Sequence, residues 1–385
     1  MIRKRSHVAK VAKLADGRHN GAMPNSPAST VPGPATFDRV RAGAFVETLK
    51  HTYEAAMLTM MLDLGHRTGL LNALAKSPAS SAQLATDTNL SERHVREWLS
   101  SLTCAGVTEY DTATTTFFLP PEHALWLTGN KSTNLAPIAA MLMGLAPRLD
   151  DVEAAFRSGG GVHYDKYRPH FTHAMDALGR AKYDELLVNT YLPKAPGLPE
   201  LLEGGVRVGD VGCGTGHCLN LMAAAYPAST FVGYDLSTEA VALGNAEAAA
   251  MGLTNVSFAA VDVLALPIHE PFDVLFAFDA IHDQANPVGV LARIREALAP
   301  GGLFFMVDIK ASSDLTKNMG QPDKVITYGI SVMHCMEVSL AVGGAGLGTA
   351  WGTELATEML GVAGFRDITV HDIERDPSNC IYVCR

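Results

Sequence analysis

Hydrophobic positions follow a helical period after the first 37 residues. From Phe37 to Asp63 the apolar side chains recur at helical spacing, which predicts one long helix. The stretches "SSAQLATDTNL" (80–90) and "SERHVREWLSSLTCAG" (91–106) predict a short helix, a turn and a second helix that begins after Ser91. The polar and aromatic run "VTEYDTATTTFFLP" (107–120) then predicts a β-wing. This order is typical of a winged helix-turn-helix domain.

Short apolar runs alternate with helical stretches from residue 201 onward. Because helical segments separate the first five runs, they predict parallel strands at 206–211, 230–235, 255–262, 272–279 and 302–309. Two further runs, 366–373 and 379–384, are joined by the turn "ERDPSN" and predict an antiparallel hairpin. The pattern therefore predicts an α/β fold, a seven-stranded Rossmann-like sheet with an antiparallel last hairpin, behind a helical winged-helix domain.

Four parts are predicted along the 385 residues. They are a leader (1–37), the winged-helix domain (38–130), linker helices (131–200) and the α/β domain (201–385), in which 311–350 is an insertion. The leader holds six Lys or Arg, one acid and a Pro- and Ser-rich stretch, so we predict that it is disordered. An organelle transit peptide and a true start at Met23 are the alternatives for this leader.

Charge and composition exclude several classes of partner. The net charge of −10 argues against a nucleic-acid or anionic-membrane surface spread over the protein. Residues 51–130 hold eight acids and four bases, a net of −4, so we expect the winged helix to dimerise the chain rather than bind DNA. The longest apolar run, 135–147, is too short to span a bilayer. Six cysteines without a C-x-x-C pair indicate reduced thiols in a cytoplasmic protein.

Bare backbone follows the first predicted strand of the α/β domain in "VGDVGCGTGH" (208–217). Gly212, Gly214 and Gly216 alternate as G-x-G-x-G behind Asp210, a pattern that suits a phosphate, a nucleoside or only a tight turn. The dinucleotide fingerprint needs a glycine at position 217, where the chain has histidine. Acids also stand at the ends of the next two strands, in "FVGYDLS" and "AAVDVLALP". Three such elements on consecutive strands favour a ligand site over a simple turn.

This combination resembles motif I and the following acidic motifs of class I S-adenosylmethionine (SAM) dependent methyltransferases. The domain order resembles that of small-molecule O-methyltransferases, and "GGGVHY", "FDAIHDQ" and "GGAGLGTAWG" resemble uncharacterised two-domain bacterial methyltransferases. The resemblance implies SAM as cofactor, a small-molecule acceptor and transfer to a hydroxyl oxygen, by a homodimer. The cofactor contacts that it implies are Asp210, Gly212, Cys213, Gly214, Gly216, Asp235, Leu236, Asp262, Val263, Phe278 and Asp279.

The resemblance also implies a general base. Phenolic O-methyltransferases carry a His-Asp pair after the fourth strand, which His282 and Asp283 match, and a carboxylate ending the fifth strand, which Asp308 matches. The family's second supporting carboxylate is missing from "LGTAWGTE", so Asp308 is expected to act alone. A structural histidine, with transfer driven by proximity, is the alternative. A metal site using Asp279 and Asp283 is a further alternative, but no metal is expected.

The acceptor pocket is predicted between 157–171 and the insertion 311–350. Its candidate residues are Tyr164, Tyr167, Met333 and His334. A nucleophile pair of His334 and Cys335 is disfavoured, because adjacent helical residues point about 100° apart. Transfer to nitrogen or carbon, and a SAM-binding transcription regulator, remain the rival functions.

Overall fold

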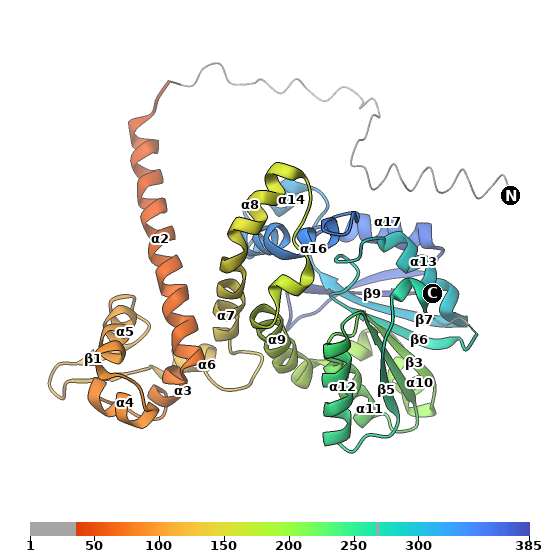
Figure 1. Cartoon of the computed structure of the whole chain (residues 1–385), viewed down its shortest axis with the longest axis horizontal. Helices are drawn as coiled ribbons and strands as arrows, with labels where there is room; N and C mark the ends of the chain where they lie inside the picture. The colour runs from red at the N-terminus through yellow and green to blue at the C-terminus, as the bar shows by residue number, and fades with distance from the viewer. Residues whose placement is uncertain (1–35, 267–268) are drawn as a thin grey trace. The chain divides into compact units, whose positions relative to one another are not determined.

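A computed structural model describes residues 36–266 and 269–385. The chain forms two compact units, one ending at Met143 and the other spanning Gly144–Arg385 (Figure 1). The predicted leader lies outside the described residues except for its last two positions. No helix in the described ranges is long and apolar enough to cross a membrane.

The first unit has the predicted winged helix-turn-helix architecture. Its elements are α2 (Arg39–Arg67), α3 (Leu70–Leu74), α4 (Ser81–Thr88), α5 (Glu92–Cys104), β1 (Glu109–Asp111), β2 (Thr116–Phe118), α6 (Pro121–Leu127) and most of α7 (Ala136–Leu145). Helix α2 begins where the Asp38 carboxylate accepts hydrogen bonds from the first turn. The Trp98 indole of α5 donates to the Met61 carbonyl at 2.8 Å and so joins α5 to α2. The core of this unit is apolar and includes Leu71 and Leu99.

The charges of α5 are paired along the helix itself. Arg93 contacts Glu97, and Arg96 lies 3.6 Å from Glu92. Both pairs join residues four apart, so the cations of this helix are neutralised by its own acids.

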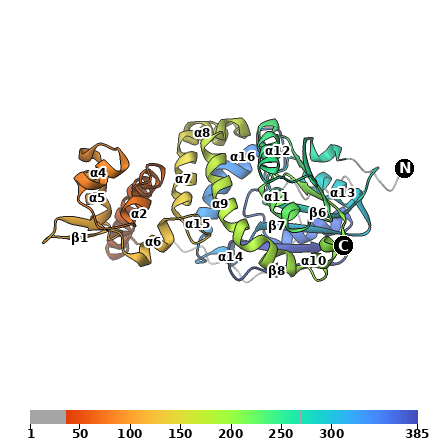
Figure 2. The ribbon, with the colours of Figure 1, turned by 90° about the horizontal axis from the view of Figure 1, so that it is seen from below.

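The second unit begins with connecting helices. They are η1 (Ala146–Arg148), α8 (Leu149–Ser158), η2 (Tyr164–Tyr167), α9 (His170–Leu186), η3 (Leu187–Tyr191), η4 (Leu192–Lys194) and α10 (Leu198–Gly204). Segments α8 and α9 contact the later η6 (Ser331–Cys335), which runs directly into α16 (Met336–Leu340). The course of α8, α9 and α16 can be followed in Figure 2. These helices therefore bring residues 157–171 next to the insertion.

A seven-stranded sheet forms the centre of this unit, as predicted. Its strands are β3 (Arg207–Val211), β4 (Thr230–Asp235), β5 (Val256–Ala260), β6 (Phe272–Phe278), β7 (Leu298–Ile309), β8 (Ile368–Asp372) and β9 (Asn379–Cys384). The order is β5-β4-β3-β6-β7-β9-β8. Strand β9 runs antiparallel to both β7 and β8, and the other neighbouring pairs are parallel. Strand β7 begins four residues before the predicted strand, where Leu298 pairs with Phe272 across a bulge.

Helices cover both faces of the sheet (Figure 1). The remaining ones are α11 (His217–Ala225), α12 (Thr238–Ala250), η5 (Val263–Ala265), α13 (Pro287–Ala297), α14 (Leu315–Asn318), α15 (Lys324–Ile330) and α17 (Thr353–Ala363). Phe276 of β6 packs in the core beneath α10, α11 and α12, whereas the adjacent Leu275 packs in the core beneath α13 and α17. This alternation follows from the period of two in a strand and leaves the carboxyl ends of the parallel strands as the free edge.

Candidate functional site

The glycine loop leaves β3 with backbone that only glycine adopts easily. Gly212, Gly214 and Gly216 have φ values of +72°, +54° and +73°. A Cβ on Gly216 would lie 2.2 Å from the ring of Phe258, so the loop packs closely on the sheet there. A Cβ on Gly214 would meet nothing within 4 Å. The loop therefore exposes its backbone at Gly214 and is held against the sheet at Gly216.

Asp235 ties this loop to the neighbouring strand. At the end of β4 its carboxylate accepts hydrogen bonds from Gly214 N at 2.9 Å and Ser237 N at 2.8 Å. Each oxygen keeps acceptor capacity for a ligand hydroxyl. The next residue, Leu236, is 71% exposed. Asp262, after β5, is exposed and caps η5 by accepting from Leu264 N at 2.9 Å.

The remaining predicted cofactor residues lie in the loop itself, in η5 and at the end of β6. Cys213 is anchored through its backbone N–H to the Tyr234 carbonyl at 3.1 Å, Val263 is buried, and Phe278 ends β6. Asp279 follows with a φ of +49° and accepts a hydrogen bond from Asn379 Nδ2 at 2.6 Å. Burial raises the pKa of Asp279 to about 6.

Asp210 is buried beneath the glycine loop. It is 1% exposed, and its Oδ1 has no hydrogen-bond partner among the described residues. Burial, together with the negative charge of Asp235, raises the pKa of Asp210 to about 7. An acceptor atom without a partner under a bare loop is a feature that a bound ligand would explain.

His282 lies just beyond β6 with a carboxylate at each ring nitrogen. Its Nδ1–H donates to Asp308 Oδ1 at 2.7 Å, and its Nε2 lies 3.4 Å from Asp283 Oδ1. The ring is 3% exposed and Asp308 is fully buried. Burial by itself would lower the pKa of His282, but the charges of Asp308 and Asp283 hold that pKa well above its ordinary value. The arrangement therefore stabilises an imidazolium.

Asp308 has more support than the sequence predicted. Trp351 Nε1 donates to its Oδ1 at 3.2 Å, and Ile309 N donates to the same atom at 2.7 Å. The expectation that Asp308 acts alone is therefore wrong. The segment that lacks the family's second carboxylate supplies a hydrogen-bond donor instead, and this donor helps to hold the Asp308 carboxylate in place.

The four predicted acceptor-pocket residues lie together. The Tyr167 hydroxyl donates to the Met333 carbonyl at 2.7 Å. The His334 ring lies with its centroid 4.6 Å from that of Tyr167 and 6.0 Å from that of Tyr164. Phe171, which the sequence analysis did not name, contacts the same ring at 4.4 Å. Two segments more than 150 residues apart thus form one aromatic cluster.

His334 and Cys335 contact each other, contrary to the helical argument. His334 Nδ1 lies 3.5 Å from Cys335 Sγ. The reason is that η6 is a π-helical turn, in which adjacent side chains diverge less than in an α-helix. Burial lowers the pKa of His334 to about 4 and raises that of Cys335 to about 12. Both groups are therefore neutral near pH 7, which does not suit a nucleophile pair.

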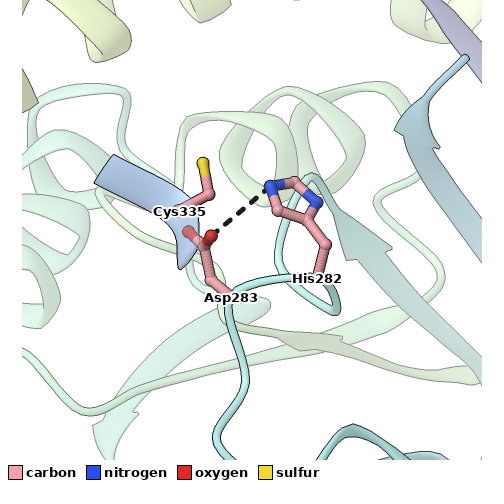
Figure 3. A group of neighbouring side chains, drawn as sticks. All are labelled: His282, Asp283 and Cys335. Carbon is pink, nitrogen blue, oxygen red and sulfur yellow. Dashed lines mark ion pairs between the residues drawn. The ribbon is translucent and has the colours of Figure 1, made fainter. Parts of the chain in front are cut away.

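Cys335 also approaches the His282–Asp283 pair, as Figure 3 shows. One ligand atom from each of the three residues lies within 4.8 Å of the other two. The sequence placed Cys335 more than 50 positions from this pair and gave no signal of the contact. Asp279, the other acid considered for a metal, instead faces Asn379.

A polar network that the sequence analysis missed braces the glycine loop. Arg180 of α9 contacts the Glu247 carboxylate of α12 and lies 2.9 Å from His217 Nδ1. Thr215 donates to Asp176, which also accepts from Arg180. His217, the departure from the dinucleotide fingerprint, is thus part of an ion-pair network. Nothing in the periodicity of α9 marks these residues.

Two family models match the chain. One described as a methyltransferase domain covers residues 202–359, and one described as an Rv2258c-like winged HTH domain covers 56–129. A trans-aconitate 2-methyltransferase from Methylobacterium nodulans is 35% identical over 101 residues, which are 26% of this chain and 37% of that protein. The chain spans about two fifths of the length of the curated relatives it matches.

Solved structures match over nearly the whole chain. The mitomycin 7-O-methyltransferase MmcR has a TM-score of 0.66 and 16% identity, over 90% of this chain and 100% of that one. Human N-acetylserotonin methyltransferase in complex with SAM has a TM-score of 0.64 and 16% identity, over 92% and 99%. These likenesses show the fold. The two family models show that the chain carries a methyltransferase domain behind a winged helix-turn-helix domain.

Proposed function

We propose that this chain transfers a methyl group from SAM to a hydroxyl oxygen of a small molecule. The observation that carries the proposal is the pairing of His282 with Asp308 at 2.7 Å, at the sheet edge that also holds the glycine loop. Ligands of open α/β sheets bind at this edge. The SAM sulfonium supplies the methyl group, and the two structural relatives named above are methyltransferases, one of them with SAM bound.

The residues of the loop fit the cofactor. Gly214 leaves room for close approach and Gly212 packs on Ala280. Asp235 has free acceptor capacity for ribose hydroxyls, and exposed Asp262 can accept from an adenine amino group. Cys213, Gly216, Leu236, Val263 and Phe278 would complete the walls. Buried Asp210 has an acceptor atom left over.

His282 would take the proton of the acceptor hydroxyl as the methyl group moves. The proton goes to Nε2, and the imidazolium that results lies between Asp308 and Asp283, whose charges stabilise it. The same charges favour the imidazolium in the free protein. Before transfer, Nε2 must therefore release its own proton to solvent, and the acceptor hydroxyl must displace the Asp283 carboxylate from Nε2. Tyr164, Tyr167 and the segment around Met333 would hold the acceptor.

Titration calorimetry with SAM and its demethylated product tests the cofactor. Asp235→Asn is expected to weaken both at least tenfold, whereas Asp367→Asn, at an exposed position, should not. Labelled methyl transfer to a panel of phenols, alcohols, carboxylates and amines then tests the acceptor atom. His282→Ala should abolish transfer to hydroxyls. Unchanged transfer to a phenol in this variant would refute the base, and transfer to amines only would favour an N-methyltransferase.

A homodimer through the first unit is the second part of the proposal. Helix α2 exposes apolar side chains along its length, among them Phe45, Tyr53 and Met57. Exposed apolar stretches of this kind favour contact with another protein surface. Light scattering of the wild type and of Met57→Glu tests this, and a monomeric wild type would refute it.

A further inference from the structure

We propose that His282, Asp283 and Cys335 form a binding site for Zn²⁺. The three ligand atoms lie within 4.8 Å of one another, and His282 Nε2 is 3.4 Å from Asp283 Oδ1 (Figure 3). Zinc bonds of about 2.0–2.3 Å place tetrahedral ligand atoms about 3.3–3.6 Å apart. The nitrogen and oxygen already have this separation, so a shift of Cys335 Sγ alone would complete the tetrahedral spacing.

The histidine is oriented as a metal ligand. Asp308 accepts from Nδ1, so the nitrogen that faces Asp283 and Cys335 is Nε2, which has a lone pair for a metal once it has lost its proton. A carboxylate behind a histidine in this way fixes the tautomer and the ring plane of metal-binding imidazoles. Asp308 itself accepts hydrogen bonds from Trp351 Nε1 and Ile309 N, so the carboxylate that orients the histidine is held in place.

Asp283 contributes an oxygen that, in the protein alone, has an ion-pair contact with His282 Nε2 at 3.4 Å. Its Oδ1 is buried and has no hydrogen-bond partner among the described residues, although the side chain as a whole is 27% exposed. Buried acceptors normally have a partner, and a metal ion would supply one here. The exposed part of the same side chain gives an ion a route from solvent.

The donor set selects the metal. A thiolate, an imidazole and a carboxylate suit Zn²⁺ and Co²⁺, whereas Mg²⁺ and Ca²⁺ prefer oxygen ligands only. Three protein ligands leave the fourth tetrahedral position to water or to an acceptor atom. On binding, the Cys335 thiol and Nε2 of the His282 imidazolium each release a proton to solvent, and the sulfur bonds the metal as thiolate.

Metal binding does not depend on the proposed methyl transfer, but it has a consequence for it. The Nε2 lone pair that binds the metal is the one that would take the acceptor's proton. With the site filled, His282 cannot act as base, so Zn²⁺ is expected to inhibit hydroxyl methylation and a chelator to restore it. This differs from the expectation of no metal that the sequence alone supports.

Cobalt titration of the full chain, after treatment with a chelator, tests the site. One equivalent of Co²⁺ should give visible tetrahedral bands and a near-ultraviolet thiolate-to-cobalt band, and Zn²⁺ but not Mg²⁺ should displace it. Cys335→Ser should remove the thiolate band, and Asp283→Asn should weaken binding at least tenfold. Cys104→Ser is the matched control, because Cys104 is an exposed free thiol of the first unit.

The outcomes separate the two proposals. A thiolate band that survives in Cys335→Ser, or a folded wild type that binds no stoichiometric Co²⁺, overturns the metal site. Circular dichroism of each variant shows whether a lost band reflects lost ligands or lost fold, and Asp283→Asn provides a second ligand variant if Cys335→Ser unfolds. If Co²⁺ binds as expected while Zn²⁺ leaves methyl transfer unchanged, the metal site stands and the base assignment of His282 fails.

Discussion

Replacing Asp210 by asparagine is expected to stabilise the protein increasingly as the pH rises from 5 to 8. In the native state the pKa of Asp210 is about 7, because burial and the charge of Asp235 disfavour its ionised form. In the unfolded chain an aspartate has a pKa of about 3.9. Between these values the unfolded state has lost the proton and the native state retains it. The wild type therefore loses stability through this group as the pH rises to 7, and no further above it.

The magnitude follows from the width of that window. Each pH unit contributes about 1.36 kcal/mol, and two units of the window lie above pH 5. Asparagine does not titrate, so the free energy of unfolding of Asp210→Asn minus that of the wild type should increase by about 2.7 kcal/mol from pH 5 to pH 8. A constant offset from the new amide group does not affect this change.

Urea unfolding followed by circular dichroism at pH 5, 6, 7 and 8 measures the difference. Asp367→Asn, at an exposed position, controls for the loss of one negative charge. Asp235→Asn removes the neighbouring negative charge, so it should lower the native pKa of Asp210 and narrow the pH range over which the stability changes. A difference between wild type and Asp210→Asn that stays constant within about 0.5 kcal/mol would refute the reasoning, because it would place the pKa of Asp210 near its unfolded value.

Two further predictions concern backbone and buried hydrogen bonds. Gly216→Ala places a methyl group 2.2 Å from the Phe258 ring at a φ of +73° and should lower the free energy of unfolding by about 3 kcal/mol or more. Gly214→Ala has free space around its methyl group and should lower the free energy of unfolding by only about 1–2 kcal/mol. Urea unfolding measures both variants, each of which is the control for the other, and a larger loss for Gly214→Ala than for Gly216→Ala would contradict the prediction. Trp351→Phe removes the donor to Asp308 at 3.2 Å and should cost about 1–3 kcal/mol, with slower methyl transfer; an unfolding midpoint and a transfer rate equal to those of the wild type would show that this hydrogen bond contributes nothing.

The sequence predicted the elements whose signal is local. Short apolar runs between helical stretches predicted all seven strands. Strands of a sheet that is covered on both faces are apolar along their whole length, so each gives a continuous hydrophobic run. The G-x-G-x-G loop and the acids Asp235 and Asp262 were found because each lies at or just after the carboxyl end of such a strand. Whether these residues bind a cofactor stays a prediction, which the calorimetry above tests.

The contacts that the sequence could not predict depend on tertiary packing. Trp351 hydrogen-bonds Asp308 although the two residues are 43 positions apart in the sequence. The sequence analysis looked for a second carboxylate in this segment and therefore did not consider the tryptophan side chain. Cys335 reaches the His282–Asp283 pair because η6 winds as a π-helix, for which the residues of this segment give no periodic signal. The early start of β7 depends on the pairing of Leu298 with Phe272, which is not visible in either segment alone.

The position of β9 has a consequence for the order of folding. Strand β8 precedes β9 in the chain but joins the sheet only through it, since β9 lies between β7 and β8. The hairpin of β8 and β9, with its short connection, can form locally and then dock on β7, because nearby segments meet before distant ones. Docking pairs Cys380 with Asp308 and thereby buries that carboxylate. Until the hairpin docks, Asp308 remains hydrated and the edge of β7 is open to other chains. Activity and resistance to aggregation are therefore gained in the same late step.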